Sequence, residues 1–171
     1  MEFLEVVRTR RSVRTYKPDP VPGDVLKQVF EAVRAAPSAN NEQPWLFLLI
    51  KDAAQRRRLA ESAADQMFIA EAPVVVVCCG RRYVDRWSWI GPHMYLVDCA
   101  IDMDHLTLAA RDAGLGTCWI GAFDHEAIKQ AVPVPPSHDI VMLTPLGYPA
   151  AHEAFHESRT RRSLSDIVPG L

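Results

Sequence analysis

The sequence predicts an α+β protein with three layers, α/β/α, in which helices flank a mixed central sheet. Two observations support this prediction. Apolar runs typical of strands recur along the chain, at 45–50, 74–79, 117–120 and 140–144. Segments with helical spacing of apolar residues alternate with them. Such alternation is typical of a sheet covered by helices on both faces.

The strands and helices have recognisable boundaries. The run at 74–79 is apolar at every position, so we expect a central strand buried on both faces. Asp52 and Asp124 are N-cap candidates, and Pro37 and Gly114 end two helical patterns. Helices are therefore expected over 3–8, 24–36, 53–64, 92–113 and 124–131, and an irregular aromatic-rich connection over 80–91.

Composition limits the class of protein. A chain of 171 residues, 49% hydrophobic and 23% charged, favours one soluble globular domain over 1–171. The net charge of −2 gives no electrostatic reason to expect nucleic acid. No apolar stretch is long enough to span a bilayer, and the N-terminus has no signal-peptide core. Adjacent Cys78 and Cys79 are poor disulfide partners, which favours a reducing, cytoplasmic setting.

Two arginine clusters lie at opposite ends of the chain. The first spans 8–14 and includes Ser12, and the second spans 159–162 within a polar tail, 150–171. A basic run is usually a solvated face. Arginine is also the side chain best shaped to hold a phosphate, so both clusters could converge on one phosphate group. The apolar residues at 164–168 need cover, for which a partner subunit is one option.

Two further segments combine turn chemistry with possible ligand contacts. The stretch 36–45, APSANNEQPW, places neutral hydrogen-bonding side chains between prolines. It suits a loop, and equally a ligand that carries hydroxyls or ring amides. The stretch 114–123, GLGTCWIGAF, allows close approach of the backbone to a flat ring. It is not G-x-G-x-x-G, so a conventional dinucleotide-binding domain is not predicted.

Metal and nucleophile sites are the less favoured interpretations. Residues 152–156, HEAFH, match a zinc protease motif, but Gly147 and Pro149 lie just upstream and only a short basic tail follows. Asp98, Asp102 and His105 could line one face of the long helix. Capping, surface exposure or a dimer contact is preferred to a metal there. The cysteines, including Cys118, are interpreted as small buried apolar residues.

Taken in order, four motifs resemble the nitroreductase family, whose members are FMN-dependent and usually homodimeric oxidoreductases. The motifs are RRSVR at 10–14, the loop at 36–45, GLGTCWIGAFD at 114–124, and GYP at 147–149 with RTR at 159–161. The resemblance implies a nitroreductase-like fold in an intertwined homodimer, with residues 150–171 packing on the partner subunit.

The resemblance also implies the site. Basic N-terminal residues would contact the FMN phosphate, the ribityl chain and the N1–O2 edge of the ring, and the C-terminal pair would complete the phosphate site. The loop would reach the flavin of the other subunit, and 120–122 would run near N5. The implied cofactor-binding residues are Arg10, Arg11, Ser12, Arg14, Pro37, Ser38, Ala39, Asn41, Gln43, Ile120, Gly121, Ala122, Arg159 and Arg161.

The implied activity is hydride transfer from NAD(P)H through FMN to a small acceptor by a ping-pong mechanism. No side chain is expected to act as a catalytic acid or base. Trp87 and Trp89 are the substrate-binding candidates, although aromatic packing at the dimer interface is an equal alternative. Three other functions stay open: a flavin-holding protein with little turnover, reductive dehalogenation, and destruction of the flavin.

Overall fold

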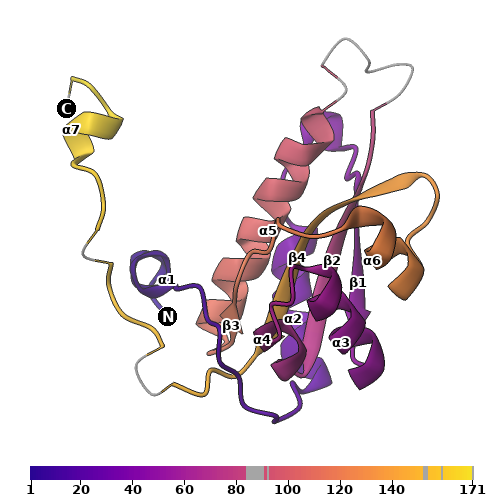
Figure 1. Ribbon diagram of the computed structural model, residues 1–171. Coiled ribbons are helices and arrows are strands. Elements are labelled where there is room, and N and C mark those ends of the chain that lie inside the picture. Colours follow the sequence, from indigo (N-terminus) through magenta and orange to yellow (C-terminus); the bar gives the residue numbers. More distant parts are fainter. Residues whose placement is uncertain (84–90, 92, 152–153, 159, 171) are drawn as a thin grey trace.

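The computed structural model describes residues 1–171 apart from 84–90, 92, 152–153, 159 and 171. Its centre is a sheet in the order β1-β2-β4-β3, in which every ladder is antiparallel (Figure 1). The strands are β1 (Trp45–Ile50), β2 (Val74–Arg81), β3 (Gly116–Thr117) and β4 (His138–Gly147). The expected strands at 45–50, 74–79 and 140–144 are confirmed, the last two within longer strands.

A mixed sheet was expected, and among the described residues parallel pairing occurs at one isolated bridge. Ser12 and Thr117 form an isolated parallel bridge at the β3 edge, while β1, β2, β3 and β4 pair antiparallel. The expected strand at 117–120 is misplaced, because it ends at Thr117. Ile120 instead makes an isolated antiparallel bridge to Leu143.

Seven α-helices and one 3-10 turn occur in the described residues. They are α1 (Phe3–Thr9), α2 (Gly23–Arg34), η1 (Ala39–Asn41), α3 (Ala53–Ser62), α4 (Phe68–Glu71), α5 (Met94–Asp112), α6 (His125–Ala131) and α7 (Leu164–Ile167). Both expected N-caps are confirmed: Asp52 accepts the Gln55 amide at 2.9 Å, and Asp124 accepts the Glu126 amide at 2.9 Å. The short elements η1, α4 and α7 were not predicted from the sequence.

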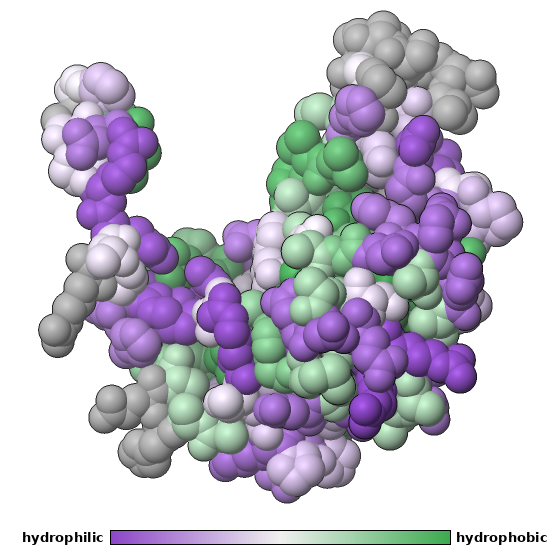
Figure 2. Space-filling view, viewed as in Figure 1, coloured by the Kyte–Doolittle hydropathy of each residue, from purple (hydrophilic) through white to green (hydrophobic). Residues whose placement is uncertain are grey.

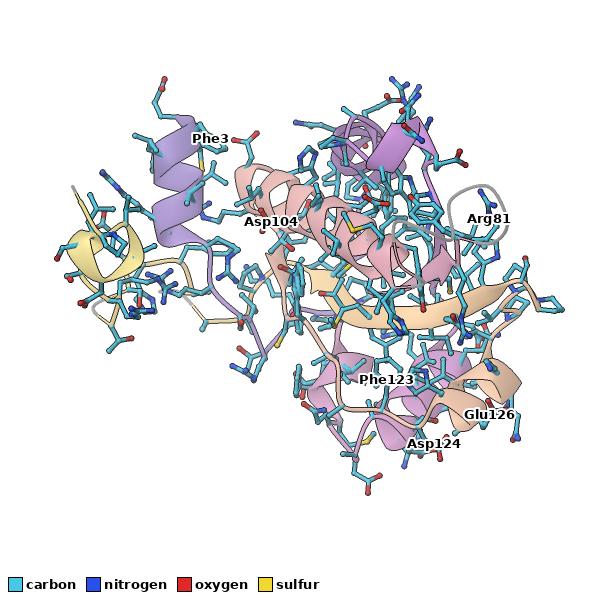
Figure 3. All side chains as sticks on the ribbon, turned by 90° about the horizontal axis from the view of Figure 1, so that it is seen from above. Phe3, Arg81, Asp104, Phe123, Asp124 and Glu126 are labelled. Carbon is cyan, nitrogen blue, oxygen red and sulfur yellow. The ribbon has the colours of Figure 1, made fainter. Side chains whose placement is uncertain are left out.

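Side chains of β2 alternate between two cores, which produces the predicted three layers. Val75 and Val77 pack with Leu59 of α3 and Ile128 of α6, whereas the alternate β2 side chains pack against α2 and α5. Figure 3 shows β4 between the layer that carries Asp104 and the layer that carries Phe123. The sheet is therefore covered on both faces, as the apolar run at 74–79 predicts.

The C-terminal segment leaves the body of the protein and ends in α7, which stands apart from the sheet and its helices (Figure 1). Leu164 and Ile167 of α7 are 63% and 60% exposed. Figure 2 shows apolar surface on the side of α7 that faces α5, and more over the upper part of α5. None of the described helices combines the length and apolar character needed to cross a bilayer.

Candidate functional site

The N-terminal arginine segment runs beside β3. The Val13 amide donates to the Thr117 carbonyl at 2.8 Å, next to the bridge between Ser12 and Thr117. The approach is so close that a Cβ added to Gly116 would lie 2.7 Å from the Val13 Cβ. Glycine is therefore required at this point of β3, and it brings Ser12 against the glycine-rich stretch.

The same segment also contacts the chain that leaves β4. The Lys17 amide donates to the Tyr148 carbonyl at 2.9 Å, and the Ala150 amide donates to the Thr15 carbonyl at 3.0 Å. The buried Tyr16 hydroxyl donates to the Val13 carbonyl at 2.6 Å, which fixes the turn between them. Three segments distant in sequence thus meet where the basic tail begins.

Arg11 lies in a strongly cationic environment. Burial lowers the pKa of its guanidinium, and the charges of Arg161 and Arg10 lower that pKa further, while Glu157 opposes them. The two chain ends therefore bring Arg11 and Arg161 into electrostatic range of each other. Like charges at this range repel, so the arrangement favours an anion between them.

One nitrogen of Arg11 has no hydrogen-bond partner among the described residues. Its Nη1 donates to the carbonyls of Arg8 and Arg10, at 3.0 and 2.5 Å. Its Nη2 is covered and makes no hydrogen bond within the described chain, although the side chain as a whole is half-exposed. An unsatisfied guanidinium N–H among other arginines fits a phosphate, which accepts several charge-assisted hydrogen bonds.

The stretch after β3 lies beside this cluster. Burial raises the pKa of the Cys118 thiol, whereas the nearby Arg14 charge and a hydrogen bond with Ser12 lower it. The Ile120 amide already donates to the Leu143 carbonyl at 2.9 Å. In the described part of the chain, the exposed Gly121 and Ala122 have no such backbone partner for their amides. These two amides, rather than that of Ile120, are available to a ligand.

The loop at 37–43 has an unusual backbone. Asn40, Asn41 and Gln43 all have positive φ, at 51°, 56° and 46°. The Gln43 amide group donates to the side-chain oxygen of Asn41 at 3.2 Å, so two predicted site residues are held together. Pro37, Asn41 and Gln43 are exposed, whereas Ser38 and Ala39 are half-buried. The loop thus presents polar side chains to the outside.

Within one protomer, this loop is far from the arginine cluster. The loop contacts Asp98 near the start of α5, whereas Arg111 at the end of α5 donates to Thr9 at 3.0 Å. Thirteen residues separate Asp98 from Arg111, which is about 20 Å of helix. Figure 3 likewise places Arg81, whose amide donates to Pro44 at the end of the loop, opposite Phe3 of α1. A single protomer does not bring the two halves together.

Several predicted residues lie outside the described part of the structure. Arg159, Trp87 and Trp89 are among them, as are His152 and Glu153 of the HEAFH motif. Tyr83, which belongs to the aromatic-rich connection expected over 80–91, is 4% exposed, so its ring has no open face. Within the described residues, no group of three or more His, Cys, Asp or Glu side chains could hold a metal.

Two of the acids on α5 are buried, which contradicts surface exposure, one of the three alternatives to a metal that were expected there. Asp98 and Asp102 are 2% and 0% exposed, and Asp102 makes no hydrogen bond with any described residue. His105 is half-buried, with its Nδ1 3.1 Å from the Ala32 carbonyl. The sequence indicates this burial only indirectly, because these acids lie in a helix that is otherwise rich in Leu, Ala and Met.

Two cavities among the described residues lie away from the predicted site. An open cavity of about 780 Å³ lies between α3 and α6 and is lined by Arg58, Phe123 and Gln130 among others. A second, of about 400 Å³, is lined by residues of α1, α2 and α5, including Phe3 and Leu108. The arginine cluster and the loop line neither of them, as expected if each is only half of a site.

The sequence and the fold are both similar to those of known proteins. A sequence model described as the Nitroreductase family matches residues 7–92 and 68–148. An NADH dehydrogenase of Thermus thermophilus is 31% identical over 82% of this chain and 83% of its own length. An FMN reductase [NAD(P)H] of Bacillus subtilis is 30% identical over 71% of this chain and 54% of its own. The crystal structure of a nitroreductase family protein from Clostridium novyi NT has a TM-score of 0.79, with 32% identity over 87% of this chain and 86% of that one.

Weaker relatives have other activities in their names. A 5,6-dimethylbenzimidazole synthase of Rhodospirillum rubrum is 25% identical, and an iodotyrosine deiodinase of Danio rerio is 24% identical over 97% of this chain. The fold, the order of the motifs and the family match agree with one another. The chain belongs to the nitroreductase family.

Proposed function

We propose that this protein is an FMN-dependent oxidoreductase that passes reducing equivalents from NAD(P)H to a small aromatic, quinone or nitro acceptor. The unpartnered Nη2 of Arg11, in a cluster with Arg10 and Arg161, carries the proposal. It fits the phosphate of FMN, and family membership supports the same cofactor. The FMN reductase among the relatives supports the nicotinamide as reductant.

The chain's own residues would bind and orient the cofactor. Arg11 and Arg161, which lie within electrostatic range of each other, would hold the phosphate, with Arg159 as the third predicted member. Ser12 follows Arg11 in the chain and is bridged to Thr117 of β3. The free amide of Gly121 or Ala122 would be the hydrogen-bond donor near the reactive edge of the ring. Bound FMN supplies hydride transfer, which no amino-acid side chain provides. Arg10 or Arg14 stabilises negative charge at the N1–O2 edge, because a fixed charge acts most strongly where water is excluded.

A homodimer would complete the site. The loop at 37–43 lies about 20 Å along α5 from the end that carries the arginines, so it cannot reach the same ligand. A two-fold axis that pairs α5 with its copy in antiparallel orientation would bring the loop of one subunit to the arginines of the other. The apolar side chains Leu164 and Ile167 on the protruding α7 support packing of residues 150–171 on the partner.

Kinetics of the ping-pong type follow if nicotinamide and acceptor occupy the same place in turn.

The direct test of the proposed function is an absorption spectrum of the purified protein with and without NADH or NADPH. We expect flavin bands that bleach within seconds under anaerobic conditions and return when air or a quinone is added. A colourless protein that takes up no FMN would contradict the proposal, and slow, partial bleaching would favour a flavin-holding protein.

Reductive dehalogenation and flavin destruction are the second candidates, supported by the relatives named deiodinase and dimethylbenzimidazole synthase. Anaerobic mixing of the reduced protein with nitroaromatic, quinone and halotyrosine acceptors separates these reactions. Rapid oxidation by a quinone or nitro compound supports the main proposal. Release of halide from a halotyrosine would instead indicate reductive dehalogenation. Permanent loss of the flavin spectrum when oxygen is added would indicate destruction of the flavin.

A further inference from the structure

The carboxylate of Asp98 joins three elements of the fold. It lies on α5 and is 2% exposed. Its Oδ1 accepts the amide of Ala39, the first residue of η1, at 3.1 Å. Its Oδ2 accepts the hydroxyl of Tyr83, which lies just after β2. A single buried acid thus connects the loop at 38–43, the end of a central strand and the long helix.

The loop at 38–43 needs such support. Three of its residues that are not glycine, Asn40, Asn41 and Gln43, adopt the left-handed region. The left-handed region is disfavoured for residues other than glycine, although less so for Asn. Inside the loop, the amides of Asn41 and Gln43 donate to the carbonyl and hydroxyl of Ser38, at 3.0 and 2.9 Å. Asp98 adds a charge-assisted bond from a helix outside the loop.

Tyr83 completes the arrangement as a donor. Burial, and then the hydrogen bond with Asp98, raise the pKa of its phenol well above the ordinary value. The phenol therefore stays protonated near neutral pH, and the carboxylate accepts from it. With donors on both oxygens, the buried charge of Asp98 is compensated by hydrogen bonds.

We propose that Asp98 is a positioning residue for the flavin site: it holds the loop at 38–43 in the shape that binds the cofactor. This inference rests on the proposed function, in which the loop contacts FMN. A loop already ordered before binding pays less conformational entropy when the ligand arrives, so the affinity rises. Asp98 itself touches neither the cofactor nor a substrate in this proposal.

The test compares Asp98 with a matched acid on the same helix. Asp104 is exposed on α5 and serves as the control (Figure 3). Titration of the apo-protein with FMN should show a Kd raised roughly 10- to 100-fold by Asp98→Ala, the effect of losing hydrogen bonds to a charged group. Asp98→Asn should raise the Kd less, because its amide oxygen still accepts the Ala39 N–H. Asp104→Asn should leave the Kd within about twofold.

Hydrogen exchange gives a readout that does not depend on the flavin. In apo-protein, Asp98→Ala should speed exchange of the amides of 39–43 at least about tenfold, while the amides of β2 and β4 keep their wild-type rates. Tyr83→Phe, which removes only the hydroxyl, should also raise the Kd for FMN and the exchange rate of these loop amides, but by less than Asp98→Ala. Its effect should vanish in the Asp98→Ala background, because the phenol then has no carboxylate partner.

Each outcome decides between the two proposals. Wild-type protein that takes up no FMN would overturn the proposed function and, with it, the flavin-positioning role. Wild-type binding together with an unchanged Kd and unchanged loop exchange in Asp98→Ala would overturn the role of Asp98 alone. Exchange accelerated equally across the sheet would make Asp98 a general stability residue, which also contradicts the positioning role.

Discussion

Asp102 lies one helical turn beyond Asp98 on α5, yet the two buried carboxyl groups are in opposite situations. Asp98 accepts hydrogen bonds from Ala39 and Tyr83. Asp102 is completely buried and has no hydrogen-bond partner in the described chain. Burial alone raises the pKa of Asp102 to about 8, so it is mainly neutral at pH 7. The neighbouring Cys78 has a raised pKa through its hydrogen bond with Cys99 and through burial, so the Cys78 thiol adds no charge.

This burial predicts that the free energy of unfolding falls as pH rises. Between the unfolded pKa of about 4 and the folded value, the folded protein keeps a proton that the unfolded chain releases. The slope is about −1.4 kcal/mol per pH unit and ends above the folded pKa. Asp102→Asn should remove this contribution. Between pH 5 and 8, the free energy of unfolding of the wild type should therefore fall by on the order of 3 kcal/mol relative to that of the variant. Urea unfolding at each pH measures the difference, and parallel curves would contradict it.

Gly116→Ala should weaken both the fold and the cofactor site. The added methyl would lie 2.7 Å from Val13 and would push the N-terminal segment off β3. We expect a loss of about 1–3 kcal/mol in the free energy of unfolding, and weaker FMN binding because Ser12 moves with the segment. Gly23→Ala is the control, since nothing lies within 4 Å of its added Cβ. Equal effects of the two substitutions in calorimetry and FMN titration would refute the prediction.

Arg11→Met should affect binding and stability in opposite directions. Removing the guanidinium takes away one of the proposed ligands of the FMN phosphate but relieves repulsion from Arg10 and Arg161. The Kd for FMN should rise about 10- to 100-fold, while the melting temperature of the apo-protein stays level or rises. Arg34→Met, at an exposed arginine paired with Glu31 at 2.8 Å, should leave the Kd unchanged. Weaker FMN binding with an equally destabilised apo-protein would mean that Arg11 serves the fold.

Arg14→Ala should lower the reduction potential of bound FMN. A fixed positive charge stabilises the negative charge that two-electron reduction places on the ring, so its removal favours the oxidised form. We expect a fall of roughly 30 mV, which corresponds to about 1.4 kcal/mol for two electrons. Anaerobic titration against a reference dye measures the potential. An unchanged potential with unchanged flavin content would assign the N1–O2 edge to Arg10 instead.

Leu164 and Ile167 should be needed for the proposed dimer. They are the exposed apolar residues of α7, which stands away from its own subunit. Replacing both by Ser should shift sedimentation from dimer to monomer at micromolar protein and lower FMN affinity, because each site needs both subunits. Ser165→Ala, a change on the same short helix, is the control. A double variant that stays dimeric and binds FMN normally would show that α7 has no part in the interface.

The sequence by itself determined the elements and the family. The apolar runs at 45–50, 74–79 and 140–144 are strands, and Asp52 and Asp124 cap their helices, because period and capping are local properties. The short helices α4 and α7 have only four residues each, too few for a periodic pattern to identify. The motif order was sufficient for the nitroreductase resemblance, which the family match confirms.

Only the tertiary structure decided which residues share a site. The contact of Val13 with Thr117 and the approach of Arg11 to Arg161 join segments more than a hundred residues apart, which no local pattern encodes. The burial of Asp98 and Asp102 depends on which face of α5 meets the sheet and η1. The apolar composition of α5 indicates that the helix is largely buried, but it does not say which acids lie on the buried face. The separation of the loop at 37–43 from the arginines likewise follows from the length of α5, and it is the reason for proposing that one chain contributes to two different sites.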